Sequence, residues 1–331
     1  MNSHPVRILG IGMMLLASTA FVRGADRPRV LERVAVFDVD GKYGGWPANH
    51  GIWMWGNEIL VGFSVGDYKD LGPTRHNIDR EKPEEHVLAR SPDGGHRWTI
   101  EYPSRQHVLV GPNGKGWRHG TLPAGESEPE PIACPGGIDI THPGFAMTMR
   151  MADTNAGESR FYYSYERGRT WKGPFKLPLF GQKGIAARTD YIVNGRHDCF
   201  VFLTASKTNR REGRVICGRT TDGGKTFQLA SFIGPEPDGY SIMPSTVRLS
   251  ERELLCTIRC KAPGGDKGRS WIEAWRSKDN GKSWEFAGEL ADTGVGNPPA
   301  LLKLKDGRLG LIYGYRAAPY EMRALLSGDN G

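Results

Sequence analysis

A histidine and three tryptophans lie close together near the start of this 331-residue chain, where His50 is flanked by Trp46, Trp53 and Trp55. An imidazole titrates near neutral pH and meets an anionic group best when it is protonated. Indole rings stack on sugar rings, but they also pack well in a core. The cluster therefore predicts either a sugar-binding site or part of a hydrophobic core.

The charge of the chain is compatible with an acidic ligand. The formal net charge is +7, and Arg7 and Arg23 near the N-terminus contribute two of these positive charges. A modest basic excess suits a carboxylated or sulfated sugar, although most of it is expected on the solvated surface. The chain has neither a lysine and arginine run nor a basic helix pattern, so no nucleic-acid partner is predicted.

Cofactor and metal motifs are absent from the sequence. It contains no nucleotide-binding glycine loop, no nucleophile elbow and no cysteine and histidine spacing of the zinc type. The acidic run Glu126, Glu128 and Glu130 is typical of a solvated loop rather than a metal site. We therefore predict no cofactor and no metal. The five cysteines are expected to be small buried residues, although Cys199 and Cys217 could face each other across a hairpin.

The first residues have the pattern of a secretory signal. Arg7 precedes a mostly apolar run over 8–22, and small residues follow it. The run is short for a membrane span, and no second apolar stretch follows. Residues 1–25 are therefore predicted to be a signal peptide and residues 26–331 the exported domain, located in the periplasm, at the cell surface or outside the cell, without a membrane span.

One short pattern recurs along the chain and organises it. It reads Ser-x-Asp-x-Gly-x-Thr-Trp with conservative changes, and the copies begin at residues 91, 164, 220, 277 and 327. An acidic side chain can close a hairpin turn by accepting backbone N–H groups, glycine takes the positive φ, and the aromatic residue plugs the turn from below. The acidic residues, for which a structural role is predicted, are Asp93, Glu166, Asp222, Asp279 and Asp329.

The spacing of the copies predicts a β-propeller. The intervals are 73, 56, 57 and 50 residues, close to the size of a four-stranded blade. The long first interval indicates a loop insertion within 102–137. Apolar, β-rich runs precede the copies, and 45 glycines and 22 prolines supply turns. These runs are 58–63, 198–203, 253–258 and 308–313.

These turns and the strands before them resemble the sialidase superfamily over 34–331, and in particular secreted bacterial sialidase-like proteins. The resemblance implies an all-β, six-bladed propeller, of which about five blades are counted here. Because the fifth copy of the turn ends at Gly331, we expect this sequence to be a fragment of a longer gene product.

The resemblance also implies a chemistry and a site. Members of the superfamily cleave glycosides with retention by a tyrosine nucleophile that a glutamate polarises, with an aspartate as acid/base and three arginines on the substrate carboxylate. Arg259 matches the second arginine, and Arg316 is preferred to Arg323 as the third. Asp79 stands near the place of the acid/base.

The chain departs from the superfamily pattern at three places. His50 stands where the first arginine is expected, and Met243-Pro244 where the glutamate is expected. The tyrosine is expected beyond Gly331, although Tyr315 and Tyr320 are available. The predicted function is that of an exo-alpha-sialidase-type hydrolase acting on a terminal acidic sugar, and the alternative is a non-catalytic propeller that binds glycans or a protein.

Overall fold

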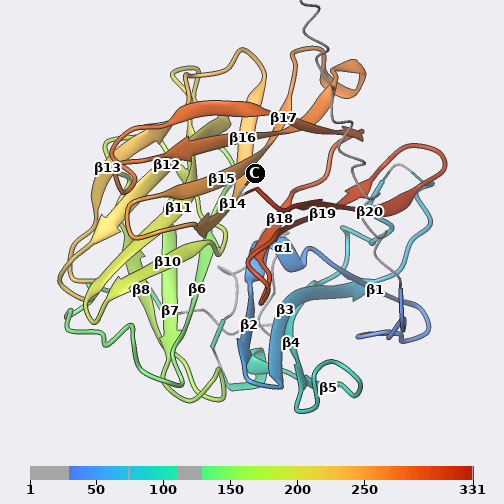
Figure 1. The fold of residues 1–331 in the computed structure, drawn as a ribbon. Helices are drawn as coiled ribbons and strands as arrows, with labels where there is room; N and C mark the ends of the chain where they lie inside the picture. Colours follow the sequence, from blue (N-terminus) through green and yellow to red (C-terminus); the bar gives the residue numbers. More distant parts are fainter. Residues whose placement is uncertain (1–29, 74, 107, 110–128, 330) are drawn as a thin grey trace, which may run out of the picture. The chain divides into compact units, whose positions relative to one another are not determined.

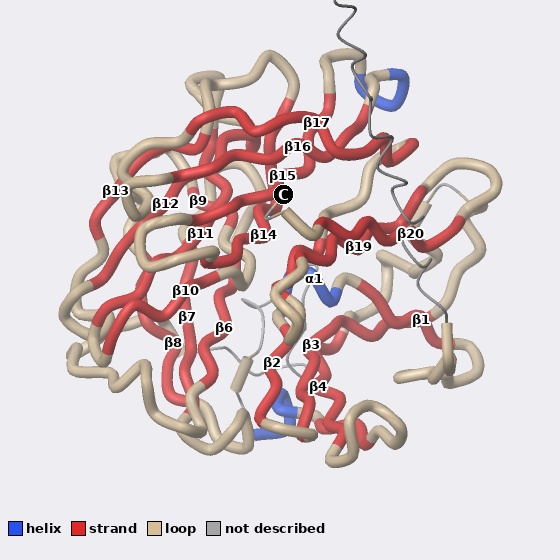
Figure 2. Tube along the Cα trace, in the orientation of Figure 1, coloured by secondary structure: helices blue, strands red, loops and turns tan. Residues whose placement is uncertain are grey.

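A computed structural model describes residues 30–73, 75–106, 108–109, 129–329 and 331. The predicted signal segment 1–25 and most of the predicted insertion lie outside these residues. Among the described residues, helix is confined to three short segments, and no helix is long and apolar enough to cross a membrane (Figure 2). The helical segments are α1 (Pro47–His50), η1 (Pro103–Gln106) and η2 (Gly265–Lys267).

The remaining described elements are strands, which form five antiparallel sheets that follow one another in chain order (Figure 1). The first blade contains β1 (Lys42–Gly45), β2 (Ile52–Trp55), β3 (Glu58–Asp67), β4 (Glu85–Ser91) and β5 (Thr99–Glu101). The second contains β6 (Ala146–Met151), β7 (Ser159–Ser164) and β8 (Lys172–Leu177). The third contains β9 (Ile185–Ala186), β10 (Tyr191–Gly195), β11 (Asp198–Ser206), β12 (Glu212–Thr220) and β13 (Gln228–Ile233). The fourth contains β14 (Tyr240–Arg248), β15 (Leu254–Lys261), β16 (Ser270–Ser277) and β17 (Glu285–Gly294), and the fifth β18 (Ala300–Lys303), β19 (Leu309–Tyr315) and β20 (Glu321–Ser327).

The predicted all-β propeller with about five blades in this chain is confirmed. The apolar runs predicted as strands fall on β3, β11, β15 and β19, the second full strand of their sheets. β11 and β15 are almost fully buried because another sheet packs on each face of theirs, whereas β3 and β19 are about half buried. The third and fourth blades share one core, in which Phe202 and Val215 pack with Leu254 and Ile258.

The recurrent turns are closed by their own side chains. In the first copy, the Ser91 hydroxyl oxygen accepts the Gly95 N–H at 2.8 Å, and Asp93 accepts the Arg97 N–H at 2.9 Å. Gly95 has a φ of +100°, which favours glycine. The Trp98 indole donates back to the Gly95 carbonyl at 2.8 Å. The hydrogen bonds that close the turn therefore all lie within it and do not depend on contacts with another blade.

The other copies follow the same geometry with one variation. Asp222 and Asp279 accept the N–H four residues later at 3.0 and 2.9 Å. Glu166, whose side chain is one methylene longer, instead accepts the Thr170 hydroxyl at 2.8 Å. Asp329 accepts the Ser327 hydroxyl at 2.5 Å. Asp222 and Asp279 also accept the hydroxyl of the residue four positions later, each at 2.6 Å, so Glu166 shares the side-chain contact with them and differs in the backbone contact.

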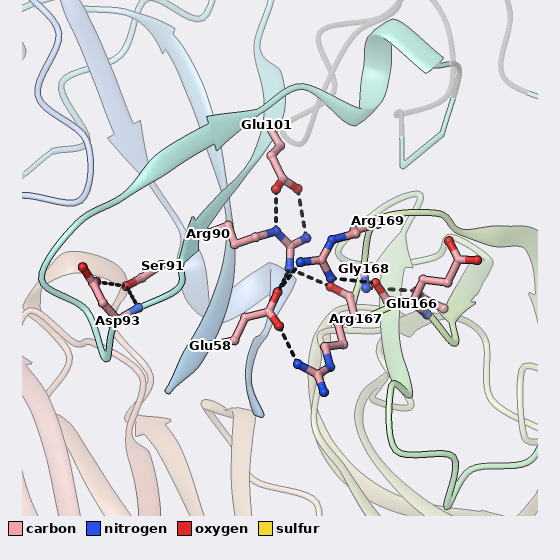
Figure 3. Close-up of polar contacts among 10 residues, drawn as sticks. Glu58, Arg90, Ser91, Asp93, Glu101, Glu166, Arg167, Gly168 and Arg169 are labelled. Carbon is pink, nitrogen blue, oxygen red and sulfur yellow. Dashed lines mark hydrogen bonds and ion pairs between the residues drawn. The ribbon is translucent and has the colours of Figure 1, made fainter. Parts of the chain in front are cut away.

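An ion cluster centred on Glu58 joins the first and second blades (Figure 3). The Glu58 carboxylate accepts hydrogen bonds from Arg90, Arg167 and Arg169, each at 2.8 Å. Arg90 also donates to both carboxylate oxygens of Glu101, at 2.5 and 3.1 Å. Burial raises the pKa of Glu58, but the hydrogen bonds from Arg167 and Arg90 outweigh it, so that the pKa lies below its ordinary value. We call this set of five residues the Glu58 clasp.

Glu58→Gln is expected to lower the free energy of unfolding by about 2 kcal/mol at pH 7, because three guanidinium groups lose a shared, charge-assisted acceptor. The contribution of a carboxylate with a depressed pKa is present above its unfolded pKa and is lost as the pH falls through its folded value. Urea denaturation at pH 7 and pH 3 measures this. The matched control is Glu285→Gln, which removes an exposed pair with Lys278 and should change little. Equal effects of both substitutions at pH 7 would contradict the role of the clasp.

Candidate functional site

A cavity of about 990 Å³ is lined by loops and strand ends of the first, third, fourth and fifth blades. β15 contributes two side chains to its lining, and the loop before β4 and the β11–β12 hairpin contribute others. Its volume is at the upper end of the range typical of small-ligand sites.

The lining of this cavity is strongly cationic. Against two carboxylates, Glu212 and Asp238, it carries seven lysine or arginine side chains. Cations gathered in a concave site raise the local concentration of anions. The cationic residues are Arg75, Arg80, Lys207, Arg211, Arg259, Lys261 and Arg316.

Arg259 lies on β15, and its positive charge has no hydrogen-bonded carboxylate among the described residues. Its guanidinium donates to the Tyr240 hydroxyl at 3.1 Å and to the Met243 sulfur at 3.7 Å, and its buried Nε has no hydrogen-bond partner. Burial lowers the pKa of Arg259, and Arg316 and Arg188 add to that effect. A buried guanidinium with an unused donor and no hydrogen-bonded carboxylate is suited to a carboxylate or sulfate of a ligand.

Arg316 follows β19 and is held by its backbone. It forms a parallel bridge with Gly294, and its N–H donates to the Thr293 carbonyl at 3.1 Å. Because its charge lowers the pKa of Arg259, the two guanidinium groups are electrostatic neighbours in the same cavity. The structure therefore brings together Arg259 and Arg316, the two arginines that the sequence ranked highest.

A tyrosine and a glutamate lie beside Arg259. Burial raises the pKa of Tyr240, and the charge of Arg259 opposes this, whereas Glu212 adds to it. Glu212 begins β12 and accepts a hydrogen bond from Arg188 at 2.5 Å. Arg188 in turn donates to Asn49 of α1 at 2.9 Å. The cavity thus contains a phenol with a carboxylate within electrostatic range.

The two lysines of the cavity differ in their bonding. Lys207 is 5% exposed, and its ammonium donates to the carbonyls of Pro237, Asp238 and Gly239 at 3.0, 3.0 and 2.6 Å. Lys261 is 8% exposed, and among the described residues its ammonium has neither a hydrogen bond nor an ion pair. Lys207 is therefore a structural tie, whereas Lys261 is available to a ligand.

The first blade contributes an imidazole and cationic side chains to the lining. His76 and Arg80 line the cavity, the Arg80 guanidinium lies 4.5 Å from the Trp46 ring centroid, and His76 packs edge-on to Trp46 at 5.0 Å. The Tyr43 hydroxyl is 3.0 Å from Nδ1 of His76. Of the three tryptophans near His50, Trp46 is therefore the one that lies next to the cavity lining.

His50 is fully buried, away from the cavity lining. Its ring contacts the Ser64 hydroxyl at 3.1 Å and the Arg150 guanidinium, and its carbonyl accepts the hydroxyls of Thr148 and Thr189. Neighbouring Trp53 packs in the core between the first two blades. His50 and Trp53 are therefore packed inside the protein, as the core alternative predicted.

Asp79 and Arg323 also lie outside the lining. The Asp79 carboxylate accepts the Glu81 N–H at 3.1 Å and lies 3.6 Å from the Lys69 ammonium, so it caps a turn in the loop that supplies His76 and Arg80. Arg323 pairs with Glu321 and lies over the Tyr315 ring at 3.6 Å. Of the acidic run, Glu126 and Glu128 lie outside the described residues.

Lys261 and Tyr240 were missed by the sequence analysis. Lys261 was detectable, because it stands two residues after Arg259 in an apolar run and must share a face of the strand with it. Tyr240 had no local signal, since only the pairing of β14 with β15 brings it beside Arg259. All five cysteines are buried and unpaired. The described residues contain no cluster of three or more metal-ligating side chains.

The fold places the chain among β-propellers of known structure. A protein of unknown function from Dyadobacter fermentans is 17% identical and superposes with a TM-score of 0.62, over 90% of this chain and 82% of that chain. At this identity the likeness concerns the fold alone.

Two more distant structures are enzymes. An alpha-L-arabinofuranosidase Arb93A from Fusarium graminearum is 11% identical with a TM-score of 0.48, over 86% of this chain and 96% of that one. A Trypanosoma rangeli sialidase in complex with sialic acid is 12% identical with a TM-score of 0.47, over 85% of this chain and 46% of that one. No protein-family model matches the sequence, and no curated protein matches it.

Proposed function

We propose that the chain is a glycoside hydrolase that binds a terminal acidic sugar in the cationic cavity and cleaves its glycosidic bond with retention. The observation that carries the proposal is Arg259, a largely buried arginine that lines the cavity together with Arg316 and whose guanidinium, among the described residues, has hydrogen bonds only to Tyr240 and Met243. The resemblance to sialidases in the sequence supports the same class of substrate.

In this proposal, the acidic group of the sugar pairs with Arg259 and Arg316, which fixes the ring over Tyr240. The Tyr240 oxygen attacks the anomeric carbon as the glycosidic bond breaks, and the phenolic proton passes to Glu212. Water then attacks the same carbon, and the bond to the Tyr240 oxygen breaks as the phenol regains a proton. The proton that leaves with the aglycone comes from the solvent-facing side of the cavity.

Tyr240→Phe is expected to lower kcat by a factor of about 1,000 or more with little change in KM, because it removes the nucleophile and leaves the arginines in place. Release of 4-methylumbelliferone from its sialoside measures this. Tyr102→Phe, in the outer part of the first blade, is the control and should keep full activity. Unchanged turnover by Tyr240→Phe would reject the assignment of the nucleophile.

The alternative is a propeller that binds an acidic glycan without cleaving it. It is favoured by the position of Asp79, whose carboxylate is engaged by Lys69 and by its own turn rather than by the cavity. Binding of sialyllactose that depends on Arg259, with no release of product over a day, would establish this alternative and exclude the hydrolase.

A further inference from the structure

We propose that the cavity recognises a saccharide with two anionic groups, of which Arg259 binds the first and Lys261 the second. This inference rests on the proposed function and extends it, because it specifies that the acidic sugar carries, itself or on its neighbour, a second carboxylate or a sulfate ester.

The first argument is the state of Lys261. Only 8% of this residue is exposed, and it lines the cavity. In the part of the chain that the structure describes, no carboxylate or carbonyl receives a hydrogen bond from its ammonium. The stem of Lys261 is therefore packed in the cavity wall, while its ammonium keeps its donors for a partner in the cavity. Lys207 has similar burial but uses its donors on three carbonyls. The contrast shows that the Lys261 ammonium, unlike that of Lys207, is available to an anionic group of a ligand.

The second argument is spacing. Arg259 and Lys261 occupy alternate positions of β15, opposite Ile242 and Tyr240 of β14. Alternate residues of a strand project from the same face, with their Cα atoms about 7 Å apart. Two anionic groups on one sugar, or on two adjacent sugars, can therefore contact both side chains at once.

The third argument is the rigidity of this segment. A Cβ on Gly239 would lie 1.8 Å from the Lys261 carbonyl oxygen, so only glycine permits this approach. The Lys207 tie holds the same segment, since Gly239 supplies one of its carbonyls. The backbone of Lys261 is thus fixed before a ligand arrives, and the ligand need not order it.

The fourth argument is the charge balance. The seven cations of the lining share it with Glu212 and Asp238; Glu212 is already paired with Arg188, and of the cations Arg80 is paired with Glu84 outside the lining. A single carboxylate on a ligand would leave most of this excess uncompensated. A second anionic group near Lys261 would reduce the repulsion between the lining cations as well as pairing with the ammonium.

The test is calorimetric binding of three probes to the Tyr240→Phe variant, in which no probe is cleaved. The probes are 3′-sialyl-N-acetyllactosamine, the same trisaccharide with a 6-sulfate on the N-acetylglucosamine, and disialyllactose. We expect at least one doubly anionic probe to bind about 10-fold more tightly than the first probe, as for one added charge-assisted hydrogen bond. The sulfated and disialylated probes show which second group is preferred.

Lys261→Met should abolish this gain and leave the affinity for the singly charged probe within about 2-fold, because only the second contact is lost. Lys261→Arg should keep the gain, and it guards against a folding defect of the methionine variant. Lys305→Met, which removes an exposed lysine outside the cavity, is the matched control and should change nothing.

Three results would overturn the inference. If all three probes bind equally well and depend on Arg259, the second site is wrong while the proposed acidic-sugar site stands. If the gain persists in Lys261→Met, the second anion binds elsewhere. If none of the probes binds, both the inference and the proposed function are rejected.

Discussion

Arg259→Met should weaken the binding of sialyllactose by a factor of about 10 to 150, because a charge-assisted contact from a buried guanidinium contributes about 1.5–3 kcal/mol and the second arginine cannot replace it. The same substitution should leave the free energy of unfolding unchanged or raise it by about 1 kcal/mol, since it removes a buried, poorly compensated charge. Calorimetry and urea denaturation measure the two effects.

This opposite response of binding and stability separates a ligand-binding arginine from a structural one. Arg219, on β12, is the control, because it forms hydrogen bonds to both carboxylate oxygens of Asp198 and lies outside the cavity lining. Arg219→Met should destabilise the fold and leave the affinity for sialyllactose unchanged. A clear loss of stability in Arg259→Met would mean that Arg259 has a structural role and would contradict the proposal.

Asp190→Asn should raise the free energy of unfolding at pH 8 by about 3 kcal/mol, because it removes a buried charge that the folded state carries at that pH. One unit of pKa shift corresponds to about 1.36 kcal/mol, and the whole shift of Asp190 sets the upper bound of the gain. Asp190 lies between β9 and β10, where its carboxylate accepts the Thr246 hydroxyl at 2.9 Å. Burial raises the pKa of Asp190 to about 7, from 3.8, and the hydrogen bonds from Thr246 oppose this only in part. The amide of asparagine keeps the size of the side chain and the acceptor oxygen.

The sign of the pH dependence follows from proton binding. Between pH 3.8 and 7 the folded state holds a proton on Asp190 that the unfolded chain has released. Stability therefore falls as the pH rises through this window and is constant above it. The difference between the wild type and Asp190→Asn should be small at pH 4 and largest at pH 8. The exposed Asp40→Asn is the control, and a difference that does not vary with pH would contradict the buried carboxyl.

The architecture was predictable because its signal is local. Each recurrent turn is closed by hydrogen bonds within five residues, as between Ser91 and Gly95, so the short pattern alone defined it. Repetition of that turn at blade-sized intervals then indicated the propeller. The four apolar runs became β3, β11, β15 and β19, and β11 and β15 are almost fully buried because neighbouring blades pack on both faces of their sheets.

The site was predictable only in part because blades assemble it. Arg259 and Arg316 could be found, since each follows or ends a recognisable strand. Tyr240 reaches Arg259 through the pairing of β14 with β15 within the fourth blade, whereas Glu212 belongs to the third blade and approaches Arg259 only through the packing of one sheet against the next. The environment of Asp79 depends on a single loop turn, which the composition of the loop does not specify.

The Lys207 tie has a consequence for the speed of recognition. Because the Lys207 ammonium donates hydrogen bonds to three successive carbonyls, it holds the segment before Tyr240 in one conformation. Ligands that meet such a prebuilt surface associate without waiting for a loop to close, so their arrival is limited by diffusion and charge attraction. The association rate constant should then fall steeply with added salt, whereas the dissociation rate constant should depend on the contacts with Arg259.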